Sequence, residues 1–277
     1  MVDSQTVLPE FECGHSFSDL PNIHEDMDEK LLTHEEYRRL RERFFASKGV
    51  QQYNAFLSNR LAHYTFETNY HDIKDLIQSH FTRRVNGQLG DWNNKEPLHT
   101  FLMEVTRLLH NYLAAAKSLV DNTRYFVKNT FGESSTPHRE YESEVKRRFG
   151  NSPVSKFTLD LRRNMTHVCM PFISSVMGGS KATGRDLFTI KLNIQKIVPS
   201  WSWCAGARHY IDAQNGEIDL ELYVIEYRGL VIQFSEWLSS QVPVWGNDEW
   251  NETMALQDKL IRYEENLDQQ FGSNKAE

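Results

Sequence analysis

Hydrophobic positions recur along much of the chain at the spacing of one helix face. The longest such stripe covers 96–131, where apolar residues return every three or four positions, and a similar spacing runs through 50–82. A shorter helix is expected at 33–46, because Thr33 followed by Glu36 is the pattern of a capping box. At 1.5 Å per residue the 96–131 helix is about 50 Å long, which suits the spine of an up-and-down bundle.

Two different patterns follow in the second half of the chain. Ser152 and Pro153 are typical of a helix start, and the apolar stripe behind them predicts a helix that reaches about Cys169. Beyond it, apolar and polar residues alternate strictly over 188–195, which is the period of a strand with one buried face. We therefore predict a β-hairpin formed by about 171–177 and 187–198.

These elements together predict a mainly α protein, an up-and-down helical bundle with a small β-hairpin insertion and additional C-terminal helices. We expect an acidic, irregular N-terminal segment at 1–30 and a single helical domain at 31–277. Within that domain the bundle core covers about 96–168, the hairpin about 171–198, and the C-terminal helices lie within 205–271, with long ones at 217–241 and 247–271.

Composition narrows the class of protein. Hydrophobic residues make up 39% and aromatic residues 12% of the chain, which is enough for a full core and excludes wholesale disorder. Cys13, Cys169 and Cys204 form no CxxC pair, so a disulfide scaffold and a cysteine-rich zinc site are not expected. The first residues lack the basic and apolar regions of a secretory signal, and no run of 18 apolar residues occurs. We expect a cytoplasmic protein with no membrane partner.

Charge is unevenly distributed along the chain. The net charge is −7, yet 1–30 alone holds eight acidic residues and one basic residue. In contrast, 139–163 holds seven basic and four acidic residues, whereas 246–277 holds eight acidic and three basic residues. The acidic average therefore does not exclude a local surface that binds anions.

Several catalytic and cofactor motifs do not occur in the sequence. It contains no GxxxxGK[ST] phosphate loop, no GxGxxG, no HExxH and no GxSxG. The histidines between 63 and 110 are not paired four residues apart, as metal ligands on a helix often are. We expect neither a metal nor a cofactor.

The candidate catalytic residues are Arg162 and His167, which lie close to the end of a basic helix. Cleavage of RNA without a metal needs an imidazole that moves protons and a fixed cation that stabilises the phosphate. In a regular helix Arg163 shares a face with His167, whereas Arg162 lies about 140° away. Arg162 can meet His167 if the helix frays, if its side chain wraps around, or if a second subunit completes the site. The helix dipole alone also favours such residues at a C-terminus.

A late helix carrying Arg-x4–6-His within a helical bundle resembles the HEPN superfamily. The match comprises Arg162, Arg163 at the position that is usually Asn, Asp or His, then Asn164 and His167. The resemblance implies a metal-independent endoribonuclease, such as a toxin or phage-defence effector, that works as a homodimer. His167 would transfer protons, Arg162 would stabilise the phosphate, and Arg163 and Asn164 would orient the RNA. The substrate's 2′-hydroxyl would attack and leave a 2′,3′-cyclic phosphate.

Three alternatives remain open from the sequence. The catalytic arginine can be Arg162 or Arg163, because both precede His167 in the motif. The chain can also be a non-catalytic HEPN-like helical module that binds nucleotide, RNA or a protein partner, with the motif acting as a helix cap. An antitoxin or another regulatory protein is a further partner that the resemblance suggests. A DNA-binding regulator is disfavoured, because no helix–turn–helix pattern stands out.

Overall fold

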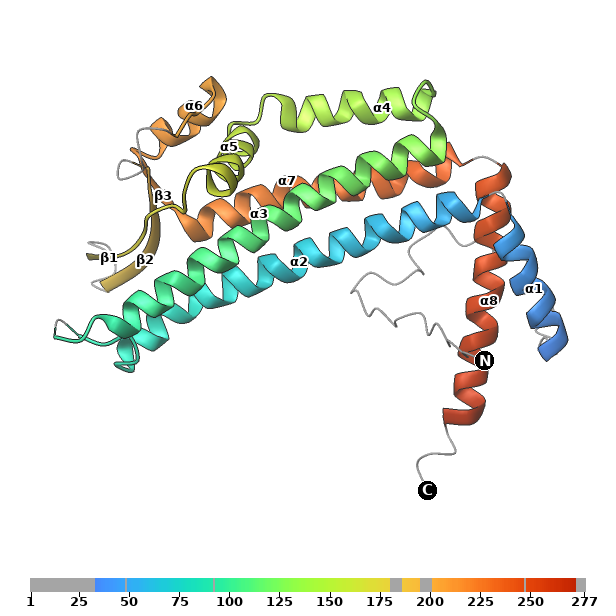
Figure 1. The fold of residues 1–277 in the computed structure, drawn as a ribbon, viewed down its shortest axis with the longest axis horizontal. Helices are drawn as coiled ribbons and strands as arrows, with labels where there is room; N and C mark the ends of the chain where they lie inside the picture. The colour runs from blue at the N-terminus through green and yellow to red at the C-terminus, as the bar shows by residue number, and fades with distance from the viewer. Residues whose placement is uncertain are drawn as a thin grey trace. The chain divides into compact units, whose positions relative to one another are not determined.

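The computed structural model describes residues 33–47, 49–91, 93–179, 186–194, 201–246 and 248–272. Within these residues the chain is mainly helical and carries one small antiparallel sheet, as the sequence predicts (Figure 1). The elements are α1 (His34–Ala46), α2 (Val50–Val85), α3 (Glu96–Phe131), α4 (Thr136–Val145), the π-helical turn η2 (Lys146–Gly150), α5 (Pro153–His167), β1 (Ile173–Gly179), β2 (Asp186–Asn193), α6 (Ala205–Ala213), β3 (Glu217–Asp219), α7 (Leu220–Trp245) and α8 (Asp248–Gly272).

The chain divides into two compact units rather than the single helical domain expected for 31–277. The smaller unit comprises Met1–Ala46 and Ala255–Glu277, and the larger unit comprises Ser47–Met254. Helix α8 contributes to both units, with the boundary before Ala255. The acidic segment predicted at 1–30 lies outside the described residues.

Aromatic stacking joins α1 to the end of α8 in the smaller unit. The rings of Tyr37 and Tyr263 stack with centroids 4.5 Å apart, and the Tyr37 hydroxyl donates to Glu264 Oε1 at 2.6 Å. Burial, together with the Glu264 carboxylate, raises the pKa of Tyr37 to about 12. The predicted capping box is confirmed, since the Thr33 amide donates to Glu36 Oε2 at 2.6 Å and the Glu36 amide donates to Thr33 Oγ1 at 3.3 Å.

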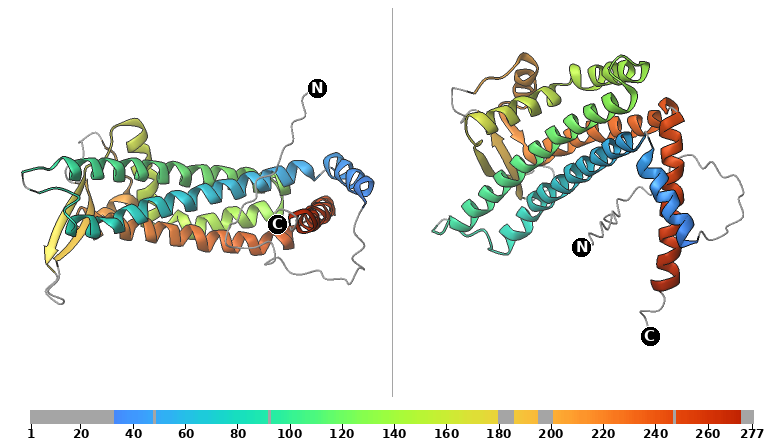
Figure 2. Two further views of the ribbon diagram at one scale, coloured as in Figure 1. Left: turned by 90° about the horizontal axis from the view of Figure 1, so that it is seen from below. Right: turned by 45° about the vertical axis from the view of Figure 1, so that its right-hand side comes forward.

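The long helices α2 and α3 lie side by side in the larger unit (Figure 2). Both helices have 36 residues, and buried side chains of each, such as Phe66 of α2 and Tyr112 of α3, pack in one core. The connection between them turns at Gly90, which has a φ of +70°. A Cβ atom at this position would lie 2.0 Å from the Asn94 carbonyl oxygen, so the turn requires glycine.

The predicted β-hairpin is confirmed for the residues that the structure describes. Strands β1 and β2 pair antiparallel, with Ile173 opposite Leu192, and the second arm is described only as far as residue 194. A third strand, β3, pairs with β2 and gives the order β1-β2-β3. The helix expected at 217–241 therefore begins three residues later, at Leu220, because 217–219 complete the sheet edge.

A buried histidine fixes the sheet on α2. His80 is 1% exposed, and its Nε2 lies 3.0 Å from the Ser175 hydroxyl of β1. The ring of His80 also packs on Phe101 of α3, with centroids 5.3 Å apart. Burial, and next the positive charge of Arg84, lower the pKa of His80 below its usual value of 6.5. The neutral imidazole is thus the form that the folded protein favours.

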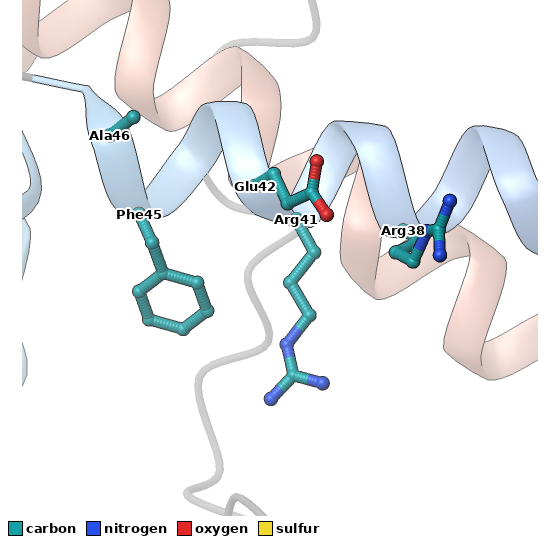
Figure 3. A pocket seen from close by; sticks show the side chains of 5 residues that line it. All are labelled: Arg38, Arg41, Glu42, Phe45 and Ala46. Atoms are coloured by element: carbon teal, nitrogen blue, oxygen red, sulfur yellow. The ribbon is translucent and has the colours of Figure 1, made fainter.

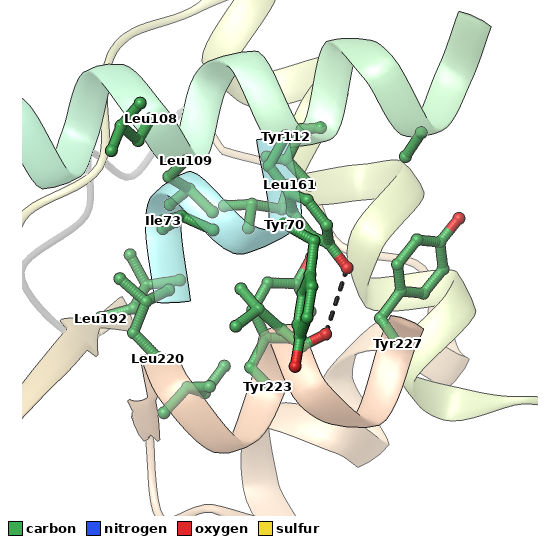
Figure 4. Packing of buried hydrophobic residues seen from close by; sticks show 14 of the residues in the cluster. Tyr70, Ile73, Leu108, Leu109, Tyr112, Leu161, Leu192, Leu220, Tyr223 and Tyr227 are labelled. Atoms are coloured by element: carbon green, nitrogen blue, oxygen red, sulfur yellow. Dashed lines mark hydrogen bonds between the residues drawn. The ribbon is translucent and has the colours of Figure 1, made fainter. Parts of the chain in front are cut away.

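The main core lies where α2, α3, α5, α7 and the sheet meet, and it is rich in tyrosine (Figure 4). The buried Tyr112 hydroxyl donates to the Val224 carbonyl at 3.1 Å, and the buried Tyr223 hydroxyl donates to Thr158 Oγ1 at 3.0 Å. These two buried hydroxyls therefore have partners, which offsets the cost of burying a polar group. In the part of the chain that the structure describes, no helix has the length and apolar character needed to cross a membrane.

Candidate functional site

Helix α5 carries the Arg-x4-His motif and is a regular helix up to its last residue. The Ser152 hydroxyl caps its first turn by accepting from the Ser155 amide at 3.3 Å, and Pro153 occupies a position where no amide is needed. Phe157 and Leu161 are fully buried and anchor the opposite side in the core. Because α5 remains helical through His167, fraying of the helix does not bring Arg162 towards His167.

Arg163 and Asn164 hold the segment 201–204 against α5. Arg163 Nη2 donates to the Ser202 carbonyl at 3.1 Å and lies 3.0 Å from the Ser202 hydroxyl. The Asn164 amide nitrogen donates to the Asp160 carbonyl at 2.9 Å and to the Ser202 carbonyl at 3.2 Å. Asn164 is only 2% exposed, so the RNA contact expected for it does not fit this environment. Both side chains serve the fold at this position.

Asp160 is a third member of this network that the sequence reasoning missed. Its carboxylate is 7% exposed; Oδ2 accepts from the Cys204 amide at 2.6 Å, and Oδ1 lies 3.2 Å from Arg163 Nη2. Cys204 is the residue immediately before α6, so Asp160 ties the start of α6 to α5. The spacing of three between Asp160 and Arg163 could have suggested their ion pair, but no sequence pattern indicates the contact with Cys204.

Arg162 and His167 behave differently from their neighbours. Arg162 is partly exposed and His167 is exposed. Neither side chain makes a hydrogen bond or ion pair with any other residue in the described ranges, whereas Arg163 makes both. In a regular helix the two residues are about 140° apart around the axis and about 7.5 Å apart along it. Helix α5 thus presents an available cation and an available imidazole on two sides of its outer face.

Aromatic rings pack the neighbouring segment, 201–204, against α5 and α6. Trp203 stacks on Phe157 with centroids 5.4 Å apart, and Tyr210 stacks on Phe157 at 5.1 Å. Trp201 is 7% exposed, and its indole nitrogen donates to Cys169 Sγ at 3.0 Å. These rings belong to the core and its edge.

Exposed apolar side chains flank the motif. They are Leu159, Val168, Met170 and Phe172, each between 45% and 55% exposed. Single exposed apolar residues are ordinary, but these four lie close to the motif in the sequence.

The described residues offer no ready site for a metal ion. No group of three or more His, Cys, Asp or Glu side chains in these ranges is arranged to hold one. Cys169 and Cys204 are not in disulfides.

Comparison of the chain with protein-family models, with curated proteins and with solved structures finds no match. The function is therefore argued from the motif, from its geometry on α5 and from the chemistry of its side chains.

Proposed function

We propose that the chain is a metal-independent endoribonuclease of the HEPN type. One observation carries the proposal: Arg163 and Asn164 are engaged by the fold, whereas Arg162 and His167 keep their polar groups available. These are the two side chains that the chemistry needs, an imidazole and a guanidinium. The same observation favours Arg162 over Arg163 as the arginine that binds phosphate.

The reaction follows from the two groups. His167, as the neutral base, takes the proton from a 2′-hydroxyl while that oxygen bonds to the adjacent phosphorus. The bond from phosphorus to the 5′-oxygen breaks, and this leaving oxygen receives a proton from an imidazolium. The products are a 2′,3′-cyclic phosphate and a 5′-hydroxyl end. Arg162 stabilises the negative charge that builds up on the phosphate oxygens.

A homodimer completes the site in this proposal. Within one α5 helix Arg162 and His167 point to different sides, so one chain offers a poorly aligned pair. A two-fold axis near α5 supplies a second arginine and a second histidine, one as base and one as acid, from the same patch on both subunits. The exposed side chains of Leu159, Val168 and Met170 are apolar surface that such an interface would bury.

The decisive experiment compares cleavage by matched variants in excess EDTA on unstructured RNA. His167→Ala is expected to lose 10²–10⁴ of the rate, which is typical for a proton-transfer group, and Arg162→Ala about 10² or more. Exposed residues on α3 provide matched controls, His99→Ala and Arg124→Ala, which should cleave at the wild-type rate. Absence of cleavage by the wild-type dimer, or equal cleavage by all variants, would overturn the proposal.

The oligomeric state is measured on the same samples. Light scattering at micromolar concentration is expected to give twice the chain mass of 32.4 kDa. A mass of one chain would contradict the two-fold site even if cleavage were seen.

The second candidate is a non-catalytic HEPN-like module that binds a protein, an antitoxin or another regulator. The exposed apolar residues beside the motif favour it, because they would suit a partner other than a second copy. In that case His167→Ala and wild type would both fail to cleave RNA, and substitution of Met170 by aspartate would abolish capture of the partner.

A further inference from the structure

Helix α1 of the smaller unit presents arginines beside an exposed aromatic ring. Arg38, Arg41 and Phe45 follow one another at spacings of three and four, so they share one side of the helix. With Glu42 and Ala46 they line a shallow hollow of about 620 Å³ (Figure 3). Figure 3 shows the side chains of Arg41 and Phe45 pointing to the same side of α1.

The two arginines of the hollow are available for a ligand. Arg38 and Arg41 make no hydrogen bond or ion pair with another residue in the described part of the chain, whereas Arg39 on the same helix pairs with Glu35 at 2.6 Å. Glu42 is the one carboxylate among the five lining residues. The hollow therefore carries an excess of positive charge and suits an anion.

Phe45 narrows the class of anion. Its ring is 60% exposed, and the Arg41 guanidinium carbon lies 5.7 Å from the ring centroid. An exposed ring next to a guanidinium offers a platform on which a base can stack, with the cation close enough to reach the adjoining phosphate. An acidic peptide would use the arginines but not the face of the ring.

We propose that the hollow formed by Arg38, Arg41 and Phe45 binds single-stranded RNA. The two guanidinium groups contact neighbouring phosphates, and Phe45 stacks on one base. This site is separate from the α5 motif, performs no chemistry and holds the strand without sequence preference. The inference rests on the proposed function only for the choice of RNA as the ligand.

Fluorescence anisotropy with a labelled, unstructured 12-nucleotide RNA tests the site in the full chain. The His167→Ala background prevents cleavage at the proposed active site during the titration. Phe45→Ala is expected to weaken binding about 5- to 150-fold, the range for loss of one stacked base, and Phe45→Trp should restore it. Arg38→Ala with Arg41→Ala should lower the slope of log affinity against log salt by about 1.4, since each single-strand phosphate contributes about 0.7.

The control is Arg39→Ala, which removes one positive charge from the same helix outside the hollow and should leave affinity within about twofold. Circular dichroism verifies that each variant keeps its helices. Unchanged RNA binding by both the Phe45→Ala and the double arginine variants would overturn the inference. The inference would also be overturned if polyglutamate competed with the labelled RNA as well as unlabelled RNA does and Phe45→Ala left RNA binding unchanged. The ligand would then be an acidic protein segment.

The two proposals fail separately. If cleavage depends on His167 but the Phe45 and arginine variants bind RNA as the wild type does, only the proposal of a second RNA site is refuted. Binding that depends on Phe45 without any cleavage by the wild type removes only the ribonuclease.

Discussion

Asn164→Ala is expected to destabilise the protein while sparing the groups assigned to catalysis. The side chain is 2% exposed, and its amide donates two hydrogen bonds, to the carbonyls of Asp160 and Ser202 at 2.9 and 3.2 Å. A hydrogen bond of this kind contributes about 1 kcal/mol net. The Ser202 carbonyl keeps its bond from Arg163, so this acceptor is not left unpaired. The expected loss is therefore about 2 kcal/mol, and not the larger cost of burying an orphaned group.

Urea unfolding followed by circular dichroism measures this change in the free energy of unfolding. In a thermal unfolding experiment, a loss of about 2 kcal/mol in a domain of about 200 residues corresponds to a fall in Tm of roughly 4–8 °C. Thr166→Ala is the matched control, because Thr166 lies on the same helix, is exposed and donates only to the Arg162 carbonyl at 2.9 Å. It should change stability by no more than about 0.5 kcal/mol.

The refuting result is specific. If Asn164→Ala keeps wild-type stability but loses RNA cleavage per folded molecule, then Asn164 contacts RNA directly and its assignment as a buried support for 201–204 is wrong. If the variant is destabilised but cleaves normally below its unfolding transition, the structural role stands.

Two further predictions concern contacts between elements of the larger unit. Arg228 of α7 donates to both carboxylate oxygens of Glu67 on α2, and the two side chains are 31% and 18% exposed. A double-mutant cycle with Glu67→Gln and Arg228→Met should therefore give a coupling free energy of about 1–2 kcal/mol. A coupling near zero would contradict this prediction. Burial lowers the pKa of His80 in the folded protein, so the unfolded chain binds a proton on this imidazole more tightly than the folded chain does. The free energy of unfolding should therefore fall as the pH drops below 6.5. His80→Leu should flatten stability between pH 6.5 and 5, and an unchanged pH profile in that variant would refute the assignment.

Local patterns in the sequence determine most of the helices. The stripe at 96–131 becomes α3 with the expected bounds, because a 3.6-residue period places its apolar side chains on one face whatever they pack against. Ser152 caps α5 because the acceptor and donor are three residues apart, a distance that the sequence itself fixes. The alternation at 188–195 similarly predicts the hairpin strand.

The tertiary structure decides the features that join distant residues. The three residues of β3 look like the start of a helix until β2 is placed beside them, because a strand that short has no period of its own. The hydrogen bond from the Cys204 amide to the Asp160 carboxylate joins residues 44 positions apart, and no local sequence pattern predicts it.

The choice between the two arginines of the motif shows the same division. Sequence spacing alone puts Arg163 on the face of His167 and makes it the better aligned candidate. In the structure the Arg163 guanidinium donates hydrogen bonds to Ser202, 39 residues away, whereas the Arg162 side chain stays available for a ligand. Spacing along one helix is fixed by the backbone, but which side chains stay accessible depends on what the rest of the chain places over that helix, and only packing in three dimensions determines that.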